Sequence, residues 1–355
     1  MFNWFKSAKT DTLPEAAQQL LQHWQLPDSG APLALLLDSV SLQKNNLRIS
    51  LKLPLLSIAQ PLQQALLDAG FSYQLTLDYQ LTTAPVFKDI KQIILVASGK
   101  GGVGKSTTAA NLALALAREG ARVGILDADI YGPSQGIMFG IPEGTRPQVK
   151  DQKWFVPLKA HGVEVMSMAF LTDENTPVVW RGPMVSGALL QLITQTAWDD
   201  LDYLVVDMPP GTGDIQLTLA QKVPVAGAVI VTTPQDLALL DAKKGVEMFR
   251  KVNIPVLGVV ENMAVHICSN CGHAEHLFGE GGGEKLAAQF GVDLLASLPL
   301  SMAIRMQSDG GKPTTIADPE SQIAMIYQET ARNVGARIAQ GGAQQAMPSI
   351  VISED

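Results

Sequence analysis

Residues 93–106 read IILVASGKGGVGKS, an apolar run that leads into a glycine-rich loop. Residues 99–106 satisfy the phosphate-binding pattern G-x-x-x-x-G-K-[ST], and an Ala- and Leu-rich segment of helical periodicity follows at residues 105–118. Glycine permits positive φ angles and close approach of the backbone, so successive N–H groups can point at phosphate oxygens. The positive end of the following helix attracts the same anion. The stretch therefore predicts a strand, a nucleotide-binding P-loop and a helix in direct succession.

Two side chains at the end of this loop have defined tasks in phosphate chemistry. We expect Lys105 to bridge the β- and γ-phosphates of ATP and the Ser106 hydroxyl to bind Mg²⁺. The residues expected to line the nucleotide are Gly99, Lys100, Gly101, Gly102, Val103, Gly104, Lys105, Ser106 and Thr107. ATP and Mg²⁺ are therefore the first two ligands that the sequence predicts.

The chain beyond residue 91 alternates short apolar segments with segments of helical periodicity. The expected strands are residues 93–97, 123–126, 163–166, 203–206, 228–231, 256–260 and 294–296. The expected helices are residues 105–118, 183–198, 237–251 and 283–290. Near-continuous apolar strands separated by helices are typical of a parallel sheet covered on both faces. We therefore expect an α/β fold with a doubly wound, mainly parallel sheet, whose ligands bind at the carboxyl ends of the strands.

The first 80 residues have a different pattern. Residues 47–53 and 72–79 alternate apolar and polar side chains like half-buried strands, and residues 13–24 and 58–69 repeat apolar side chains at helical spacing. The expected organisation is a small α+β accessory domain over residues 1–80, a linker over 81–90, a P-loop ATPase domain over 91–340 and a disordered tail over 341–355.

Composition narrows the classes of partner. The chain has 355 residues and a formal net charge of −8, which argues against a general electrostatic grip on nucleic acid or anionic lipid. No apolar run reaches the roughly 18 residues of a membrane span, and the N-terminal sequence MFNWFKSAKT does not resemble a signal peptide. Only two cysteines are present, which excludes a disulfide framework. We expect a cytoplasmic protein without stable membrane insertion and without a nucleic-acid partner.

Acidic residues stand where two further strands are expected to end. Asp207 closes the apolar run YLVVD, the place from which a Walker B acid reaches the water shell of Mg²⁺. Asp127 and Asp129 close the run VGILDAD; one of them is expected to orient the attacking water and the other to support Mg²⁺ or cap the turn, and spacing alone does not decide which. In the loop MPPGTGD, Gly211 or Gly213 is expected to offer a backbone N–H to the γ-phosphate.

Both cysteines, Cys268 and Cys271, fall in a single CxxC within the segment HICSNCGHAEH. With His273 and His276 the pair has the ligand types of a mononuclear zinc site, although His273 follows Cys271 more closely than is usual. A redox dithiol and two unrelated thiols are the other conventional interpretations. The remaining interpretation is that the two thiolates bind an iron–sulfur cluster, which usually takes four such ligands. Because one chain supplies two, a [4Fe–4S] cluster would be shared by two subunits of a symmetric dimer.

Lys100 is an additional lysine inside the P-loop, five residues before Lys105. In this respect the sequence resembles the deviant Walker A, or SIMIBI, class of P-loop NTPases. The resemblance implies that Lys100 reaches across a homodimer to the partner's nucleotide, where its charge would stabilise the transition state as an arginine finger does. The expected catalytic residues are Lys100, Lys105, Asp129 and Asp207.

The motifs GKGGVGKS, LDADIYGPS, VVDMPPGTGD, ENM and CSNCG occur in the order seen in the Mrp/ApbC family, which the chain resembles over residues 89–339. Members are ATP-dependent iron–sulfur cluster carriers. The resemblance implies that Cys268 and Cys271 bridge a labile cluster between protomers, that Asp129 acts in hydrolysis and that Asn262 lies near the adenine. It also implies a cluster-assembly scaffold as donor and apo iron–sulfur proteins as recipients. The N-terminal unit is similar to a small domain of many members, without the cysteine that some carry.

Two alternatives stay open at this point. A positioning ATPase of the ParA/MinD type would share the P-loop, Lys100 and the aspartates. However, the tail QQAMPSIVISED, which is acidic at its end, supplies no amphipathic anchor of the kind such a protein uses. The CxxC would also have no role in such a protein. A zinc-loaded P-loop ATPase would use the cysteines and histidines as a structural site. An electron-transfer ATPase like the nitrogenase iron protein also has a P-loop and a cluster that bridges a dimer. Its paired cysteines lie far apart in the sequence, whereas those of this chain lie in one CxxC.

Overall fold

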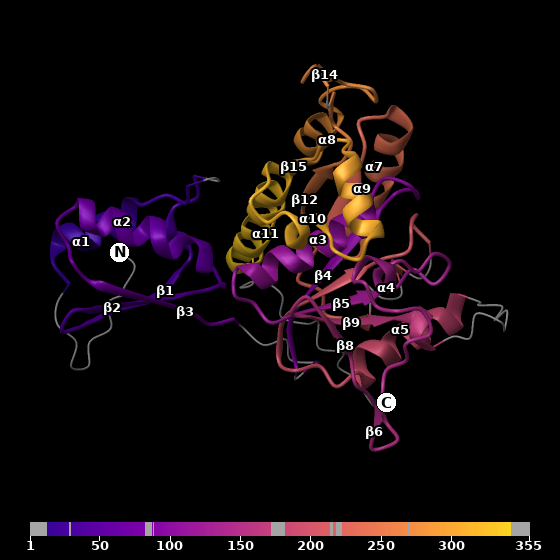
Figure 1. The fold of residues 1–355 in the computed structure, drawn as a ribbon, viewed down its shortest axis with the longest axis horizontal. Helices are drawn as coiled ribbons and strands as arrows, with labels where there is room; N and C mark the ends of the chain where they lie inside the picture. The colour runs from indigo at the N-terminus through magenta and orange to yellow at the C-terminus, as the bar shows by residue number, and fades with distance from the viewer. Residues whose placement is uncertain are drawn as a thin grey trace, which may run out of the picture.

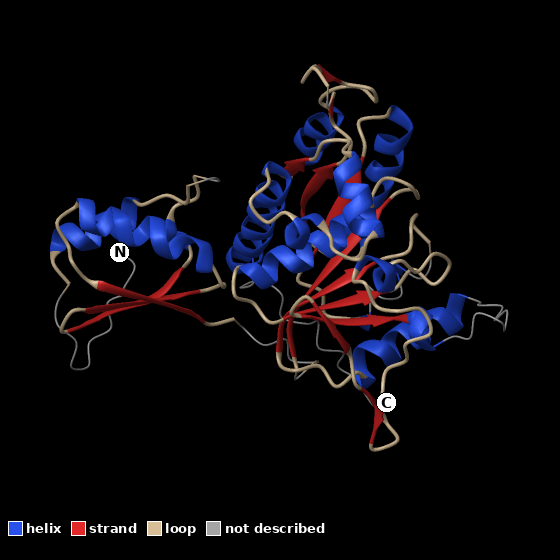
Figure 2. Cartoon of the chain, viewed as in Figure 1, coloured by secondary structure: helices blue, strands red, loops and turns tan. Residues whose placement is uncertain are grey.

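The computed structural model describes residues 13–27, 30–81, 87, 89–171, 182–213, 216–217, 222–268 and 270–341. The opening FNWF, most of the expected linker and residues 342–355 of the expected tail lie outside these ranges. The described chain forms a small N-terminal sheet with its helices and a larger unit built on a central sheet (Figure 2).

The N-terminal unit is a three-stranded sheet covered by two helices. Its strands are β1 (Leu37–Gln43), β2 (Asn46–Leu51) and β3 (Gln74–Tyr79), with β2 antiparallel to β1 and parallel to β3. Its helices are α1 (Glu15–His23) and α2 (Ala59–Asp68), the latter preceded by the single 3₁₀ turn Leu56–Ile58. Leucines from all of these elements fill one apolar core. Both expected helices and both expected strands therefore form, and β1 is an additional strand that the alternation did not indicate.

The larger sheet has eight strands. Their order is β15 (Leu294–Ser297), β12 (Val256–Glu261), β11 (Gly227–Thr232), β4 (Ile90–Ser98), β10 (Leu201–Asp207), β5 (Val123–Asp127), β9 (Val163–Ser167) and β8 (Leu158–Ala160). All neighbours are parallel except the edge pair β8 and β9. The seven expected strands are all present, and the prediction of a mainly parallel α/β sheet is confirmed. The carboxyl ends of β4, β10 and β5 adjoin one another, which brings the P-loop next to the aspartates.

Alternation along the central strands divides the apolar side chains between two cores. On β4, Ile93 and Leu95 belong to one core while Ile94 and Val96 belong to the other. The first core is covered by α5 (Gly182–Gln195), α7 (Asp236–Lys251) and α8 (Gly282–Phe290). The second is covered by α3 (Lys105–Arg118) and α11 (Gln322–Gly341). Helices on both faces shield the central strands from solvent. The sheet therefore supports the loops at its carboxyl edge on a packed core.

The remaining elements were not expected from the sequence. They are α4 (Gln135–Met138), β6 (Val149–Lys150), β7 (Trp154–Phe155), β13 (His266–Ile267), β14 (Ala274–Glu275), α9 (Met302–Asp309), α10 (Thr314–Ala317), the 3₁₀ turns Leu33–Leu35 and Met168–Leu171, and the already described β8 and α11. The expected tail began at Gly341, which is instead the last residue of α11. In Figure 1, α11 lies between the N-terminal unit and α3, and Ala336 of α11 contributes to the N-terminal core.

Polar contacts centred on two buried carboxylates join the N-terminal unit to the larger one. The carboxylate of Glu119, at the end of α3, accepts hydrogen bonds from the Ser57 N–H and hydroxyl and pairs with Arg332 of α11. The Tyr79 hydroxyl donates to Asp202 at 2.7 Å, near the start of β10. Because Glu119 and Asp202 are both buried, these contacts hold the two units in a defined arrangement.

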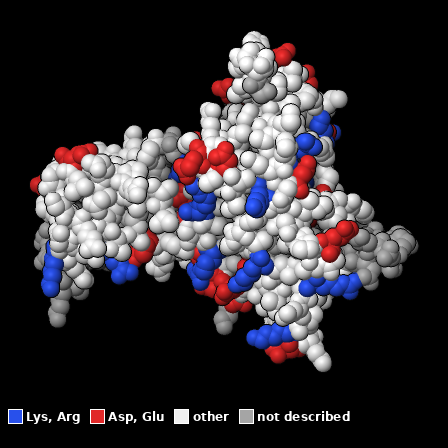
Figure 3. Space-filling view, in the orientation of Figure 1, with Lys and Arg blue, Asp and Glu red and all other residues white. Residues whose placement is uncertain are grey.

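Charged side chains of both signs are interspersed on the face shown in Figure 3. Within the described part of the chain, no helix combines the length and the apolar character that crossing a bilayer requires.

Candidate nucleotide site and cysteine hairpin

The glycine-rich loop connects the end of β4 to the start of α3. Gly104 adopts φ +84°, and a Cβ built there would lie 2.1 Å from the Asn262 amide nitrogen. A Cβ on Gly99 would lie 2.2 Å from the backbone of Asp241 in α7. Glycine is therefore required at both positions, at the first by conformation and at both by close packing.

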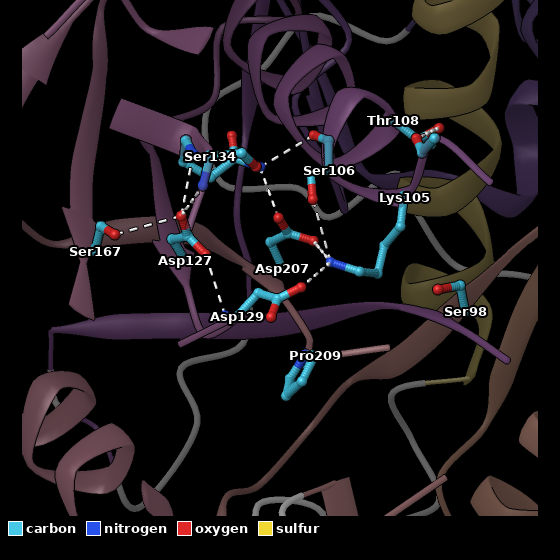
Figure 4. A network of polar contacts seen from close by, with 12 residues as sticks. Ser98, Lys105, Ser106, Thr108, Asp127, Asp129, Ser134, Ser167, Asp207 and Pro209 are labelled. Carbon is cyan, nitrogen blue, oxygen red and sulfur yellow. Dashed lines mark hydrogen bonds and ion pairs between the residues drawn. The ribbon is translucent and has the colours of Figure 1, made fainter. Parts of the chain in front are cut away.

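The Lys105 ammonium lies at the centre of a buried network (Figure 4). Its Nζ is 2.5 Å from Asp207 Oδ1, 3.7 Å from Asp129 Oδ2 and 3.2 Å from the Ser106 hydroxyl. The expected loop lysine, the expected Mg²⁺-binding serine and two of the expected acids thus converge from three different elements. A cation shared by two carboxylates is positioned for exchange onto phosphate oxygens, which carry more charge.

Asp127 is occupied by the turn that follows β5. Its Oδ1 accepts the Asp129 N–H at 3.1 Å, and its Oδ2 accepts the N–H groups of Ser134 and Gln135 at 2.9 and 3.0 Å. Burial and the charge of Asp207 raise the pKa of Asp127 to about 7, although these N–H groups oppose the shift. Asp127 therefore caps the turn, which was one of the three tasks left open for it beside orienting the attacking water and supporting Mg²⁺. Asp129 is the acid that faces Lys105; burial raises its pKa while the ammonium opposes the shift.

Gln135, which the sequence analysis did not single out, joins the same network. It is fully buried at the start of α4, and its Nε2 donates to Asp207 Oδ2 at 2.8 Å and to the Ser106 carbonyl at 3.0 Å. The residue directly follows the quoted motif LDADIYGPS, but a glutamine in a loop carries no pattern that marks it.

Three other expected residues have partners within the protein. The Lys100 ammonium points to Gln235 Oε1 at 3.4 Å, away from the Lys105 network. The Gly211 N–H donates to the Ser98 carbonyl at 2.9 Å, so it would have to leave that bond to reach a phosphate. The Thr107 carbonyl accepts from Asn111 inside α3. These contacts tie the loop after β10 to the end of β4, and the P-loop to the residue before α7.

The donor set suits Mg²⁺. This ion prefers hard oxygen ligands and is usually held by one or two carboxylates or hydroxyls together with substrate phosphates. The Ser106 hydroxyl and the carboxylates of Asp207 and Asp129 are such groups, and they adjoin the same ammonium. The residues present therefore fit a Mg²⁺ ion bound with nucleotide.

The two cysteines lie at the tip of a short hairpin made by β13 and β14. The Cys268 N–H donates to the His273 carbonyl, and the Gly272 N–H donates to the Cys268 carbonyl at 2.8 Å. Neither thiol forms a disulfide, and Cys271 is exposed. The N–H groups of Cys271 and Asn270 and the Cys271 thiol hold the pKa of Cys268 below its usual value. Such a turn favours the thiolate, the form that binds metals.

The neighbouring histidines do not complete a ligand set with the thiols. The His276 Nδ1 donates to the Ala264 carbonyl at 2.9 Å, and its Nε2 is 3.8 Å from Glu280. Within the described ranges, no three His, Cys, Asp or Glu side chains are grouped so that they could hold a metal ion. A mononuclear zinc site made by Cys268, Cys271, His273 and His276 is thus not assembled in this arrangement.

The segments that flank the hairpin on both sides run close to the nucleotide loop. Asn262, at the end of β12, donates from Nδ2 to the Val103 carbonyl at 2.9 Å. On the return side, a Cβ built on Gly279 would lie 3.6 Å from the Pro234 carbonyl oxygen, and Pro234 precedes the Gln235 that contacts Lys100. One flank of the cysteine segment therefore contacts the P-loop directly, and the other lies near the neighbour of a residue that contacts it.

A strand, P-loop and helix in succession, with an aspartate at the end of the adjacent parallel strand, define a P-loop NTPase. The chain belongs to the ParA family described as NUBPL iron-transfer P-loop NTPase, whose model matches residues 89–335. The expected resemblance to iron–sulfur cluster carrier ATPases is thereby confirmed.

Individual relatives agree with this membership. An iron–sulfur cluster carrier protein of Pseudomonas fragi is 84% identical over 251 residues, covering 71% of this chain and 88% of the relative. One from Haemophilus influenzae is 47% identical and covers the whole of both chains. Among solved structures, a nucleotide-binding protein of Archaeoglobus fulgidus in complex with ADP has a TM-score of 0.56 at 40% identity, covering 64% of this chain and 88% of that one.

Proposed function

We propose that this protein is an ATP-dependent iron–sulfur cluster carrier that holds a labile cluster at a homodimer interface and delivers it to apo-proteins. The observation that carries the proposal is the contact with the Val103 carbonyl of the P-loop made by Asn262, which stands at the end of β12 on the segment that leads into the thiol hairpin. Through this contact, a conformational change of the nucleotide loop can be transmitted to the cysteine loop. A carrier controlled by nucleotide requires such a connection. The names of the relatives, iron–sulfur cluster carrier and transfer proteins, agree with it.

The stoichiometry of thiols supports a shared cluster. A [4Fe–4S] cluster usually takes about four cysteine ligands, and each chain contains two, Cys268 and Cys271. Their exposure in a turn leaves the cluster accessible to an acceptor. Two copies related by a twofold axis would supply the complete set. The donor would be a cluster-assembly scaffold and the recipients apo iron–sulfur proteins.

Exposed apolar side chains near both sites support the dimer. Leu237 and Leu240 of α7 are exposed close to the Gln235 that contacts Lys100, and Ile267 and Leu277 are exposed on the cysteine hairpin. Covering them in an interface would remove their apolar surface from water. A second copy that covers them would place Lys100 near the partner's nucleotide and the two hairpins near each other.

In the hydrolytic step, water attacks the γ-phosphorus, the bond to the β-phosphate oxygen breaks, and ADP and phosphate leave. Bound Mg²⁺ supplies neutralisation of phosphate charge. Lys105 moves from Asp207 to the phosphates, and Asp129, which faces Lys105 and is not used by the turn, orients the water. Lys100 of the opposite protomer adds positive charge in the transition state.

Anaerobic reconstitution with iron and sulfide tests the carrier function. The parent should bind about four irons per dimer with matching sulfide, whereas Cys268→Ala and Cys271→Ala should each lose the cluster. His273→Ala and His276→Ala are the matched controls on the same hairpin and should retain it. Stoichiometric zinc without sulfide, or cluster transfer by either cysteine variant at the parent's level, would overturn the proposal.

A further inference from the structure

Gln135 contacts three motifs of the nucleotide site at once. Its side chain reaches the P-loop at Ser106 and the Walker B acid Asp207, and its backbone N–H donates to Asp127 Oδ2. The Ser106 carbonyl and the Asp207 carboxylate are both acceptors, so they fix the amide orientation with Nε2 between them. Its Oε1 is buried and has no hydrogen-bond partner among the described residues.

We infer that Gln135 is a positioning residue that clamps Asp207 to the Ser106 main chain and thereby sets the affinity of the site for Mg²⁺-bound nucleotide. The inference rests on the proposed nucleotide-dependent function and concerns a residue that acts through its neighbours rather than on the phosphates. The side chain is fully buried, so the clamp is protected from competing water.

The two oxygens of Asp207 have different partners. Lys105 holds Oδ1 and Gln135 holds Oδ2. When phosphate oxygens draw the ammonium away, only Oδ1 loses its partner. Gln135 then keeps the carboxylate in place, with the freed oxygen on the side of Lys105 and Ser106. An Asp207 without this clamp could turn about its side-chain bonds, and part of the binding free energy would be spent on ordering it.

The clamp also connects Asp207 to the loop after β5. The Gln135 backbone N–H and the Asp129 N–H bind the same Asp127 carboxylate, so the turn that presents Asp129 and the residue that holds Asp207 share one anchor. A movement of this loop shifts both acids together. Gln135 thus links the position of Asp129, the acid that orients water, to that of Asp207, the acid expected near Mg²⁺.

The test compares binding of a fluorescent ADP analogue with excess Mg²⁺ and with EDTA. Gln135→Met keeps the approximate volume and removes both donated hydrogen bonds. Bonds to charged acceptors are worth enough that we expect about tenfold weaker binding with Mg²⁺. Binding in EDTA should change little, because it depends on the loop N–H groups and Lys105.

Gln328→Met is the matched control. Gln328 of α11 is also buried, also donates from Nε2 to a carboxylate, that of Glu119, and also has a buried Oε1 without a described partner. It lies outside the nucleotide site, so its variant should bind nucleotide like the parent under both conditions. Melting temperatures of the nucleotide-free proteins measure the general cost of losing a buried amide at each position.

Three results would overturn the inference. The first is unchanged Mg²⁺-dependent binding in Gln135→Met; the second is an equal loss with Mg²⁺ and with EDTA, which indicates a structural role. The third is a full additional loss when Gln135→Met is combined with Asp207→Ala, because a residue acting through Asp207 should add little. If Gln135→Met does not fold, Gln135→Glu replaces it and should lose more Mg²⁺-dependent affinity through repulsion of Asp207. Cluster loading of the parent is measured separately, so failure of the carrier function is distinguishable from failure of the clamp.

Discussion

Lys105 and Asp207 form a buried ion pair between the P-loop and the end of β10, with Nζ 2.5 Å from Oδ1. Asp207 is fully buried and the Lys105 side chain is 6% exposed. The lysine that should bind phosphate is therefore held by the acid that should face Mg²⁺. Nucleotide binding and the environment of Asp207 are linked, because the ammonium has to exchange one anionic partner for another.

Removal of the ammonium should destabilise the nucleotide-free protein. Lys105→Met keeps the length of the side chain but leaves the Asp207 carboxylate buried without its cation. Breaking a buried pair in this way costs about 3 kcal/mol, so the free energy of unfolding in urea should fall by that amount. The double variant with Asp207→Asn should recover part of the loss, since the fully buried carboxylate nearest to the ammonium is removed as well, while Asp129 still lacks its cation.

Lys100→Met is the control within the same loop. Lys100 contacts a neutral amide oxygen at 3.4 Å, so its loss should leave the free energy of unfolding close to that of the parent. Because Lys100 is proposed to act on the partner's nucleotide in the transition state, the variant should nevertheless lose ATPase activity. Equal stability of Lys105→Met and the parent would contradict the prediction for the buried pair.

Asn262→Ala should uncouple the cysteine hairpin from nucleotide. The variant loses the amide contact to the Val103 carbonyl, which joins the end of β12 to the P-loop. We expect the cluster to bind with the parent's stoichiometry, while the effect of ATP on its transfer rate to an acceptor falls. The measurement is the rate of cluster transfer with and without ATP, followed by absorbance.

His266→Ala supplies a comparison on the same segment, since its ring contacts the Leu300 carbonyl at 3.4 Å rather than the P-loop. It should keep the response to ATP. A transfer rate in Asn262→Ala that responds to ATP as strongly as in the parent would show that the coupling runs elsewhere.

The strands and the P-loop were predictable because each depends on a local pattern. Buried parallel strands read as continuous apolar runs, and the phosphate loop requires glycine and lysine at fixed spacing. Helix α11 shows the limit of this approach. It packs on α3 and on the N-terminal unit, and contacts between segments so far apart in the sequence carry no local pattern that marks them.

Site residues that stand at the ends of strands could be predicted from the sequence. Site residues that are brought together only by contacts between distant segments could not. Asp127, Asp129 and Asp207 follow apolar runs, and the parallel sheet brings those ends together. Spacing did not divide the tasks of Asp127 and Asp129, because the division depends on which carboxylate the turn N–H groups reach. Gln135 gave no signal at all, since its importance comes from contacts with residues 29 and 72 positions away.

Glu119→Ala should weaken the attachment of the N-terminal unit. The Glu119 carboxylate accepts from Ser57 and pairs with Arg332, and its loss leaves the partly covered guanidinium without this anion. We expect a fall of about 3 kcal/mol in the free energy of unfolding. By calorimetry, the variant should show an earlier transition from the N-terminal unit. Glu320→Ala is the control, because its pair with Arg118 is exposed. A single transition at the parent's temperature would contradict the prediction.

Asp202→Asn should reduce stability in a pH-dependent manner. Burial alone would raise the pKa of Asp202, but the Arg122 N–H, the Lys91 ammonium and the Tyr79 hydroxyl outweigh it and hold the pKa below its usual value. The unfolded chain therefore binds the proton more readily, so the carboxylate stabilises the fold at neutral pH and this contribution is lost as the pH falls below about 4.

The free energy of unfolding of the parent should accordingly exceed that of Asp202→Asn at pH 7, and the difference should shrink as the medium is acidified below about pH 4. Asp200→Asn removes a neighbouring carboxylate that pairs with the same Arg122 but is 53% exposed. Such a surface pair is worth about 1 kcal/mol or less, so that variant should follow the parent closely across the series. Urea titrations at several pH values supply the comparison. A difference that stays constant with pH would mean that Asp202 contributes through its shape and hydrogen bonds, which asparagine partly retains, rather than through its charge.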